Sequence, residues 1–417
     1  MFRGRKSTGL YPPPPTIHAA EMRTGGSKSL TAAGAPEAFV TFAREFFMSL
    51  IITISLITQF KIMAEEIKRL APEAVWGYIY DLTQIPRPTG HMKHIHPKTL
   101  SLCTVMTRCL LLALLILGVT VEGHAQSLYV KTFGKADGVP LIFLHGGPGY
   151  NAAAFESVAA QALADNGFRV LVYDRRGEGR SLHTAARYTF DEALHDIDSL
   201  CRTYDLHRPV LLGHSFGGIL ALLYADKHPE QVRSVVLMSA PLALQASFDN
   251  IRNRCRAIYA SRADSVNLRY MNMLDAMDKG SMEYASYCFM HAAGNGFYVP
   301  KARTKEGQSV YAAFEADSAL FPLSKLSEWQ APQGFHRNEH YTTLDLTDTL
   351  RRILHRGTPV YGLYGADDGL YSAAQLDALR NLLGPDHMIT LDSCSHNVFI
   401  DRRHAFIEAL THHCKTK

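Results

Sequence analysis

One serine stands in a setting that suits a nucleophile. Ser215 is the centre of Gly-His-Ser-Phe-Gly, which fits the pattern G-x-S-x-G between an apolar run and a stretch with helical spacing. Glycines at this spacing allow a strained turn and a close approach of strand and helix, so that the serine oxygen projects above a sheet. We therefore predict a nucleophile elbow, with an ordinary turn serine as the alternative.

Two later segments could supply a general base and its acid partner. His396 lies in Ser-Cys-Ser-His-Asn, after an apolar run and ahead of a helical stretch. Asp367 and Asp368 lie in Gly-Ala-Asp-Asp-Gly, after an earlier apolar run. An acid beside the base would hold its tautomer and stabilise the imidazolium, and the order serine, aspartate, histidine matches that of the α/β-hydrolases. The two adjacent aspartates leave the choice of acid open at this point.

A glycine-rich loop could stabilise the negative charge that such chemistry develops. Residues 145–149, His-Gly-Gly-Pro-Gly, end an apolar run. Backbone N–H groups of this loop, together with that of Phe216, could donate to the oxygen of a tetrahedral intermediate. Gly147 is the preferred donor and Gly146 the alternative, while a plain Gly/Pro turn remains the competing interpretation.

Three neighbouring features receive structural interpretations. Residues 174–181, Asp-Arg-Arg-Gly-Glu-Gly-Arg-Ser, lack the Lys-Ser/Thr of a phosphate-binding loop, so we interpret them as a structural loop beside the site. His214 precedes the serine, and we expect it to pack under the elbow. Cys394 lies two residues before His396, and we expect a small buried filler because free cysteines are mostly buried.

The elements that must position these residues alternate between strand and helix. Continuous apolar runs are typical of parallel strands buried on both faces, which predicts an α/β fold with a mostly parallel sheet flanked by helices. The predicted strands cover residues 127–133, 139–144, 168–173, 209–212, 234–238, 359–364 and 387–391, and clear helical stretches cover 217–227 and 402–413.

The pattern changes over residues 241–352, which are rich in Met, Tyr, Arg, Ala and Asp and mostly helical in period. We predict an inserted helical cap, which leaves residues 126–240 and 353–417 as the core. Ligands of open α/β sheets bind beyond the carboxyl ends of the strands, so a cap there would shape the substrate pocket.

The first 125 residues do not resemble part of this fold. We interpret residues 1–105 as a non-native or disordered extension, within which residues 63–96 resemble the N-terminus of bacterial aminoacyl-histidine dipeptidases without their metal-binding core. Residues 106–125 predict a secretory signal peptide, because an apolar run at 109–119 follows basic residues and precedes a small-x-small site ending at Ala125. We therefore expect export to the periplasm or the medium after cleavage near Ala125.

Composition excludes several classes of function. The chain is 47% hydrophobic and 20% charged, as expected of a globular protein, and its net charge of +4 forms no basic stripe for a nucleic acid. The 20 His are scattered without the spacing of a zinc site, so we expect no metal and no cofactor. The apolar run at 109–119 is too short to span a bilayer and lies in the segment that we expect to be removed, so we expect no stable membrane span in the mature protein.

Together, the motifs His-Gly-Gly-Pro-Gly, Asp-Arg-Arg-Gly-Glu-Gly-Arg-Ser and Gly-His-Ser-Phe-Gly-Gly resemble the proline iminopeptidase group of the α/β-hydrolases, peptidase family S33 in type. The resemblance covers about residues 128–410, although the insertion matches poorly. It implies the α/β-hydrolase fold and a serine that attacks the peptide bond after an N-terminal proline, without metal. The G-x-x-D spacing familiar in this fold favours Asp368 as the acid, which leaves Asp367 to cap the loop.

The same resemblance implies acidic cap residues that hold the free amine of the substrate. Glu283 and Glu339 are the candidates, and solvated surface charges are the alternative for each. The family's elbow is typically G-G-S-W-G, whereas this chain has Gly-His-Ser-Phe-Gly, as in many esterases.

The leading hypothesis is a serine hydrolase that forms an acyl-enzyme and trims small peptides in the manner of a proline iminopeptidase. A carboxylesterase acting on small-molecule esters is the alternative within the same class. A non-catalytic, hydrolase-like binding protein is the alternative from another class. The expected partner is a small molecule or a short peptide, and the sequence leaves the oligomeric state open.

Overall fold

The computed structural model describes residues 128–415. The predictions for residues 1–105, for the dipeptidase-like segment 63–96 and for the signal peptide 106–125 lie outside these residues.

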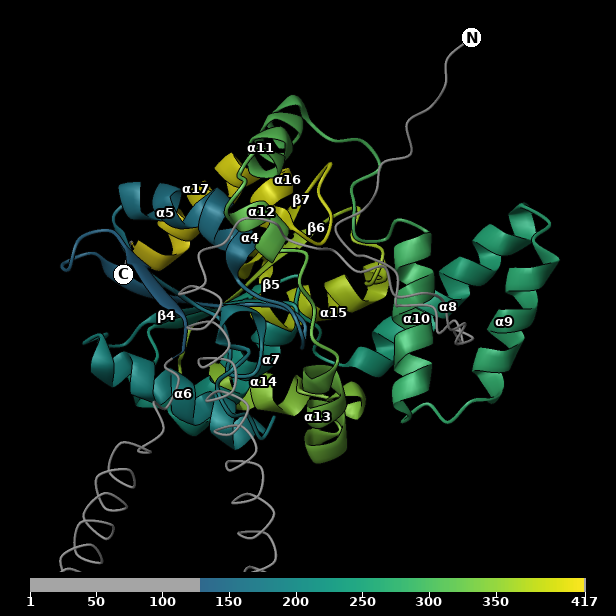
Figure 1. The fold of residues 1–417 in the computed structure, drawn as a ribbon, viewed down its shortest axis with the longest axis horizontal. Coiled ribbons are helices and arrows are strands. Elements are labelled where there is room, and N and C mark those ends of the chain that lie inside the picture. Colours follow the sequence, from purple (N-terminus) through teal and green to yellow (C-terminus); the bar gives the residue numbers. More distant parts are fainter. Residues whose placement is uncertain (1–127, 416–417) are drawn as a thin grey trace, which may run out of the picture. The chain divides into compact units, whose positions relative to one another are not determined.

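A seven-stranded sheet forms the centre of the fold (Figure 1), in the order β1-β3-β2-β4-β5-β6-β7. All neighbouring strands pair in parallel except β1 and β3, which are antiparallel. The predicted mostly parallel sheet is therefore confirmed. The strands are β1 (Val130–Phe133), β2 (Val139–Leu144), β3 (Phe168–Tyr173), β4 (Val210–His214), β5 (Ser234–Met238), β6 (Val360–Gly365) and β7 (Met388–Leu391).

The sheet is buried on both faces because its inner strands are apolar at nearly every position. Successive side chains of a strand point to opposite faces. In β2, Ile142 and Leu144 join one apolar cluster, and Leu141 and Phe143 join the other. Each fully buried side chain of this size stabilises the fold by about 1.5–3 kcal/mol, which explains why uninterrupted apolar runs mark these strands.

Helices cover the two faces of the sheet. The first apolar cluster includes side chains of α6 (Phe190–Thr203), α7 (Phe216–Lys227), α14 (Thr347–His355) and α15 (Ala373–Leu383). The second includes side chains of the segment that comprises α4 (Ala153–Phe155), η1 (Glu156–Ala160) and α5 (Gln161–Asp165), and of α16 (Val398–Asp401) and α17 (Arg403–Lys415). Short 3₁₀ turns are η2 (Gly179–Ser181), η3 (Pro229–Gln231), η4 (Tyr341–Thr343) and η5 (Pro385–His387).

The insertion after β5 is helical and contains no strand within the described residues 241–352. Its helices are α8 (Leu244–Ser261), α9 (Ser265–Ala276), α10 (Met282–Gly294), α11 (Lys305–Glu315), α12 (Leu320–Leu323) and α13 (Gln330–Glu339). Figure 1 shows α8, α9 and α10 together on one side, whereas α11 and α12 lie near α16 and α4, against which they pack. The helix α14, which straddles the predicted boundary at residue 353, packs against α7.

The strand order places a switch point at β2. The strands β3 and β4 flank β2, so the chain connections diverge there and leave a crevice beyond the carboxyl ends of β2 and β4. Residues 145–149 follow β2 and Ser215 follows β4, which brings the glycine-rich loop and the serine to this crevice. Among residues 128–415, no helix is both long and apolar enough to cross a bilayer.

Candidate active site

Ser215 occupies a strained turn between β4 and α7. Its backbone has φ 52° and ψ −121°, a region that residues other than glycine rarely adopt. The turn requires glycine nearby, because a Cβ at Gly217 would lie 2.0 Å from the carbonyl oxygen of Leu144. The serine N–H donates to the carbonyl of Met238 at 2.9 Å, which ties the turn to β5. This geometry is that of a nucleophile elbow.

His396 and Asp368 are hydrogen-bonded to each other. The His396 Nδ1 and Asp368 Oδ2 atoms lie 2.9 Å apart, and both side chains are buried. The other oxygen of Asp368 accepts the N–H of Leu370 at 3.1 Å. Asp367 instead accepts the N–H of Lys301 at 3.1 Å and pairs with its Nζ at 3.2 Å. Of the two adjacent aspartates, Asp368 is the one that can orient the imidazole of His396.

His214 lies beside His396 and has a different role. The two imidazole rings are 5.0 Å apart, and the His214 Nε2–H donates to the carbonyl of His396 at 3.0 Å. Burial, and to a smaller extent repulsion by a protonated His396, lower the pKa of His214 to about 3. His214 is therefore neutral near pH 7 and supports the backbone of His396.

The serine and the histidine are not hydrogen-bonded in this state. Within the described chain, the Ser215 hydroxyl has no hydrogen-bond partner, and the His396 ring lies next to the residue that precedes the serine. Hydrogen bonds of this kind are often long in a free enzyme and tighten when substrate binds. Proton transfer requires the Ser215 hydroxyl and the imidazole of His396 to come within hydrogen-bond distance.

The loop at residues 145–149 packs directly against the serine. A Cβ at Gly146 would lie 3.2 Å from the Cβ of Ser215, so the loop borders the nucleophile closely. Gly147 has φ 113°, and within residues 128–415 neither its N–H nor that of Phe216 donates a hydrogen bond. Phe216 is the first residue of α7, where an N–H has no acceptor within the helix. Two N–H groups, one in the loop that borders Ser215 and one directly after the serine, thus have no acceptor within the described residues and are available as donors.

Within the described residues, neither of the proposed amine-binding glutamates is hydrogen-bonded to Ser215, Asp368 or His396. Glu339 Oε1 accepts the N–H of Phe190 at 2.7 Å, so its carboxylate caps the start of α6. Glu283 lines a pocket of about 420 Å³ between α10 and α13, together with Tyr287, Trp329 and Arg337. Neither Ser215 nor His396 is among the residues that line this pocket.

Two residues that the sequence did not mark as candidates contact His396 or the residue before it. Tyr298, which follows α10, presents its ring edge-on to His396 at 5.3 Å. Asp401 accepts the N–H of Ser395 at 2.8 Å, and burial raises the pKa of Asp401 to about 6. The sequence offers one signal for Asp401, a carboxylate directly after the apolar residues 398–400, whereas nothing marks Tyr298.

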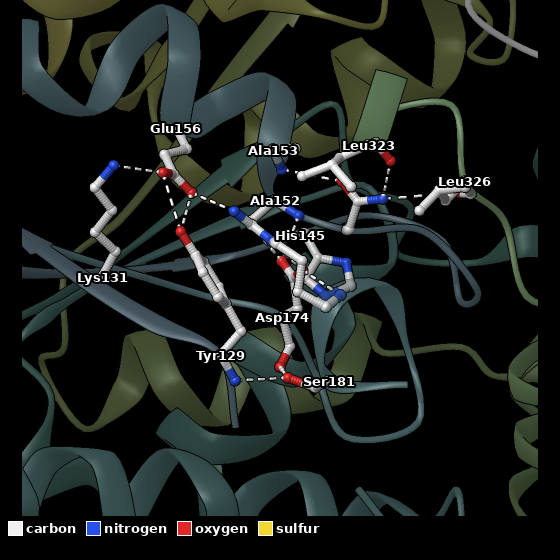
Figure 2. A network of polar contacts seen from close by, with 12 residues as sticks. Tyr129, Lys131, His145, Ala152, Ala153, Glu156, Asp174, Ser181, Leu323 and Leu326 are labelled. Carbon is white, nitrogen blue, oxygen red and sulfur yellow. Dashed lines mark hydrogen bonds and ion pairs between the residues drawn. The ribbon is translucent and has the colours of Figure 1, made fainter. Parts of the chain in front are cut away.

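Residues 174–181 form a loop that is fastened by charged side chains (Figure 2). Asp174 accepts the N–H of Ala152 at 2.9 Å and pairs with Arg180 at 2.7 Å. Arg180 also pairs with Glu156 at 2.6 Å, and its guanidinium stacks over the ring of Tyr129 at 3.5 Å. These contacts join the loop to Tyr129, which directly precedes β1, and to the segment after β2, in keeping with a structural loop beside the site.

The groups around Ser215 can support acyl transfer. A strained serine, a histidine oriented by a buried carboxylate and two free N–H donors are the parts that nucleophilic catalysis at a carbonyl requires. Within residues 128–415, no three His, Cys, Asp or Glu side chains are grouped so that they could hold a metal ion.

Comparison with known proteins places this arrangement in a family. The model of the alpha/beta hydrolase fold matches residues 139–403. A non-heme chloroperoxidase of Streptomyces lividans is 33% identical over 261 residues, which cover 60% of this chain and 82% of the relative. A proline iminopeptidase of Neisseria gonorrhoeae is 36% identical over 114 residues, which cover 27% of this chain.

The sequence similarity to the Neisseria proline iminopeptidase covers a minor part of that protein, whereas a solved structure of a related protein matches more of the chain. The chain spans 36% of the length of the Neisseria protein. A solved proline iminopeptidase-related protein of Thermus thermophilus superposes with a TM-score of 0.50 and 25% identity, covering 68% of this chain and 92% of that one. The chain therefore belongs to the α/β-hydrolase fold family and is distantly homologous to proline iminopeptidases and non-heme haloperoxidases.

Proposed function

We propose that this protein is a serine hydrolase that forms an acyl-enzyme on Ser215, with small peptides that carry an N-terminal proline as its leading substrates. The observation that carries the proposal is the buried 2.9 Å hydrogen bond between His396 and Asp368, at the same sheet edge as the strained Ser215. The partial similarity to a proline iminopeptidase supports the choice of substrate.

The proposed reaction runs in two halves. His396 Nε2 takes the hydroxyl proton as Ser215 Oγ attacks the substrate carbonyl, while Asp368 stabilises the imidazolium through Nδ1. The N–H groups of Gly147 and Phe216 donate to the oxyanion of the tetrahedral intermediate. His396 then returns the proton to the leaving amine. A water molecule then gives a proton to His396 and attacks the acyl-enzyme carbonyl, and His396 returns that proton to Ser215 Oγ as the bond to the acid breaks.

A carboxylesterase is the second candidate for the same site. The elbow sequence Gly-His-Ser-Phe-Gly supports it, because the proline iminopeptidases typically have a different elbow. The carboxylate of Glu339 also accepts a hydrogen bond from Phe190, so only Glu283 is left as a candidate to bind the free amine of a peptide substrate. An alcohol leaving group needs the same proton donation as an amine, so the proposed mechanism serves both substrates.

A panel of chromogenic substrates tests the proposal. Proline p-nitroanilide, alanine p-nitroanilide and p-nitrophenyl butyrate would be run with the wild type and with Ser215→Ala. Preferential cleavage of the prolyl amide, lost in the variant, is expected. Cleavage of the ester alone would support the carboxylesterase. Because the chain is similar to a non-heme chloroperoxidase, halide oxidation with hydrogen peroxide is also assayed. No turnover in any assay would support the binding-protein hypothesis.

We also propose that the protein is exported after cleavage near Ala125. N-terminal sequencing of the protein recovered from the periplasm or the medium should begin at Gln126. An intact segment 106–125 in the recovered protein would contradict this proposal.

A further inference from the structure

A buried ion pair lies directly behind the glycine-rich loop. The side chains of Arg175 and Glu178 are 3% and 0% exposed. Arg175 Nε and Nη2 each donate to a different oxygen of Glu178 at 2.9 Å, which makes the pair bidentate. Removing two charges from water is costly unless their remaining hydrogen-bonding groups are also satisfied. The partners of those remaining groups therefore indicate what the pair is for.

The remaining groups of the pair are satisfied by residues 145–149. Arg175 Nη1 donates to the carbonyl of His145 and Nη2 donates to the carbonyl of Gly146 at 2.7 Å. Glu178 Oε2 accepts the N–H of Gly149 at 2.7 Å. The pair thus holds both ends of the loop, with the arginine on two consecutive carbonyls and the glutamate on an N–H.

These contacts determine which way the peptide between Gly146 and Gly147 faces. In a trans peptide the C=O and the following N–H point in opposite directions. Because the Gly146 carbonyl is held by Arg175, the Gly147 N–H points away from the guanidinium. Glycine allows a peptide plane to rotate at little steric cost, so the orientation depends on the two contacts of the Gly146 carbonyl, with Arg175 Nη2 at 2.7 Å and with His145 Nδ1 at 2.9 Å.

We propose that Arg175, anchored by Glu178, is the positioning residue that sets the oxyanion-binding N–H of Gly147. This inference rests on the proposed function and deepens it. Without the guanidinium, the Gly146 carbonyl keeps only its 2.9 Å contact with His145 Nδ1, so the peptide can turn its carbonyl oxygen toward the site, where it repels the oxyanion that the N–H stabilises. Arg175 touches no reacting atom and acts through the loop.

The same stretch of chain offers a matched control. Arg180 forms its own buried pairs with Asp174 and Glu156, but within the described residues its contacts go to other parts of the fold and not to residues 145–149. Arg175→Met and Arg180→Met each remove one guanidinium from an ion pair. Both variants should lower the melting temperature, whereas only Arg175→Met should affect the loop.

The test compares kcat, KM and inhibitor binding for the two variants and for Arg175→Lys. For the best substrate of the panel, Arg175→Met should lose about 10²–10³-fold in kcat, the effect of removing one oxyanion donor, with KM changed by less than about threefold. The inhibition constant of a trifluoromethyl ketone, which forms an oxyanion on the serine, should rise in parallel. Arg175→Lys should be intermediate, because one ammonium cannot hold both carbonyls in the fork geometry. Arg180→Met should keep kcat within about threefold of the wild type.

If both methionine variants lose kcat, and each loss follows the decrease in that variant's melting temperature, Arg175 is merely structural and the inference is overturned. A crystal structure of Arg175→Met gives a readout independent of activity: a turned Gly146–Gly147 peptide is expected, and an unchanged one would also overturn it. A wild type that turns over no substrate would instead refute the proposed function, and the peptide orientation in the crystal would still decide what Arg175 does.

Discussion

Replacing Asp368 by asparagine tests how the base is oriented. The wild-type carboxylate accepts a hydrogen bond from His396 Nδ1–H at 2.9 Å, which leaves Nε2 unprotonated and able to take the serine proton. The asparagine amide has nearly the same shape but can donate through its nitrogen. Nδ1 then becomes the acceptor and Nε2 carries the proton, so the histidine presents the wrong tautomer to Ser215.

The size of the effect follows from the geometry. At a charge separation of about 4 Å and an effective dielectric constant of about 20, a carboxylate stabilises an imidazolium by about 4 kcal/mol, or about 10³-fold in rate. The wrong tautomer adds to this loss, so we expect kcat to fall by about 10³–10⁴-fold. The fold should persist, because asparagine fills the same volume and its oxygen can still accept the N–H of Leu370.

The assay is the initial rate of chromogenic substrate hydrolysis, with circular dichroism to verify folding. Asp367→Asn is the matched control, because Asp367 pairs with the exposed side chain of Lys301 and should retain nearly full activity. A folded Asp368→Asn protein within tenfold of the wild-type kcat would refute the reasoning. A large loss in Asp367→Asn alone would assign the acid to the other aspartate.

Three further predictions concern packing, pH and substrate binding. Gly217→Ala should destabilise the protein by at least about 1–3 kcal/mol in urea unfolding, because its Cβ would meet the carbonyl of Leu144 at 2.0 Å; unchanged stability would contradict the elbow packing. The unfolding free energy should fall as the pH drops from about 6.5 toward about 3, because His214 binds a proton in the unfolded chain while the buried side chain stays neutral. This residue contributes up to about 1.4 kcal/mol per pH unit in that window, so His214→Asn should show a shallower slope than the wild type, and equal slopes would argue against a neutral buried His214. Glu283→Gln should raise KM for the prolyl amide but not for the ester, whereas Glu339→Gln should affect stability and leave both KM values unchanged; the reverse pattern would exchange their roles.

The core of the fold follows from local sequence patterns because its strands are buried on both faces. The predicted strands at 139–144, 168–173 and 234–238 have the observed bounds of β2, β3 and β5. The edge strand β1 begins three residues later than predicted, at Val130, where its pairing with β3 begins. A strand at the edge of the sheet pairs on one side only, so its apolar residues define its ends less sharply than those of an inner strand.

Long-range contacts could not be predicted in the same way. The helical period identified the insertion as helical, but it could not indicate that α11 and α12 pack on α16 and α4 while α8, α9 and α10 lie together. The use of Glu339 as a cap for α6 joins residues 149 positions apart, and no local pattern encodes it.

The site itself was predictable to different depths. Motif order along the chain pointed to Ser215, Asp368 and His396, because each follows a strand that ends at the same edge of the sheet. The contacts of Arg175 with residues 145–149 depend on β2 and β3 being neighbours, a pairing that the order of elements does not specify. Cys394 is buried as expected of a filler, and burial raises the pKa of its thiol, which makes it a poor rival nucleophile.

Mass spectrometry after treatment with a fluorophosphonate probe tests the central claim most directly. We expect a single adduct on the wild-type protein that maps to the peptide containing Ser215, and no adduct on Ser215→Ala. An adduct mapped to another residue, or an unlabelled wild type, would contradict the assignment of Ser215 as an activated nucleophile.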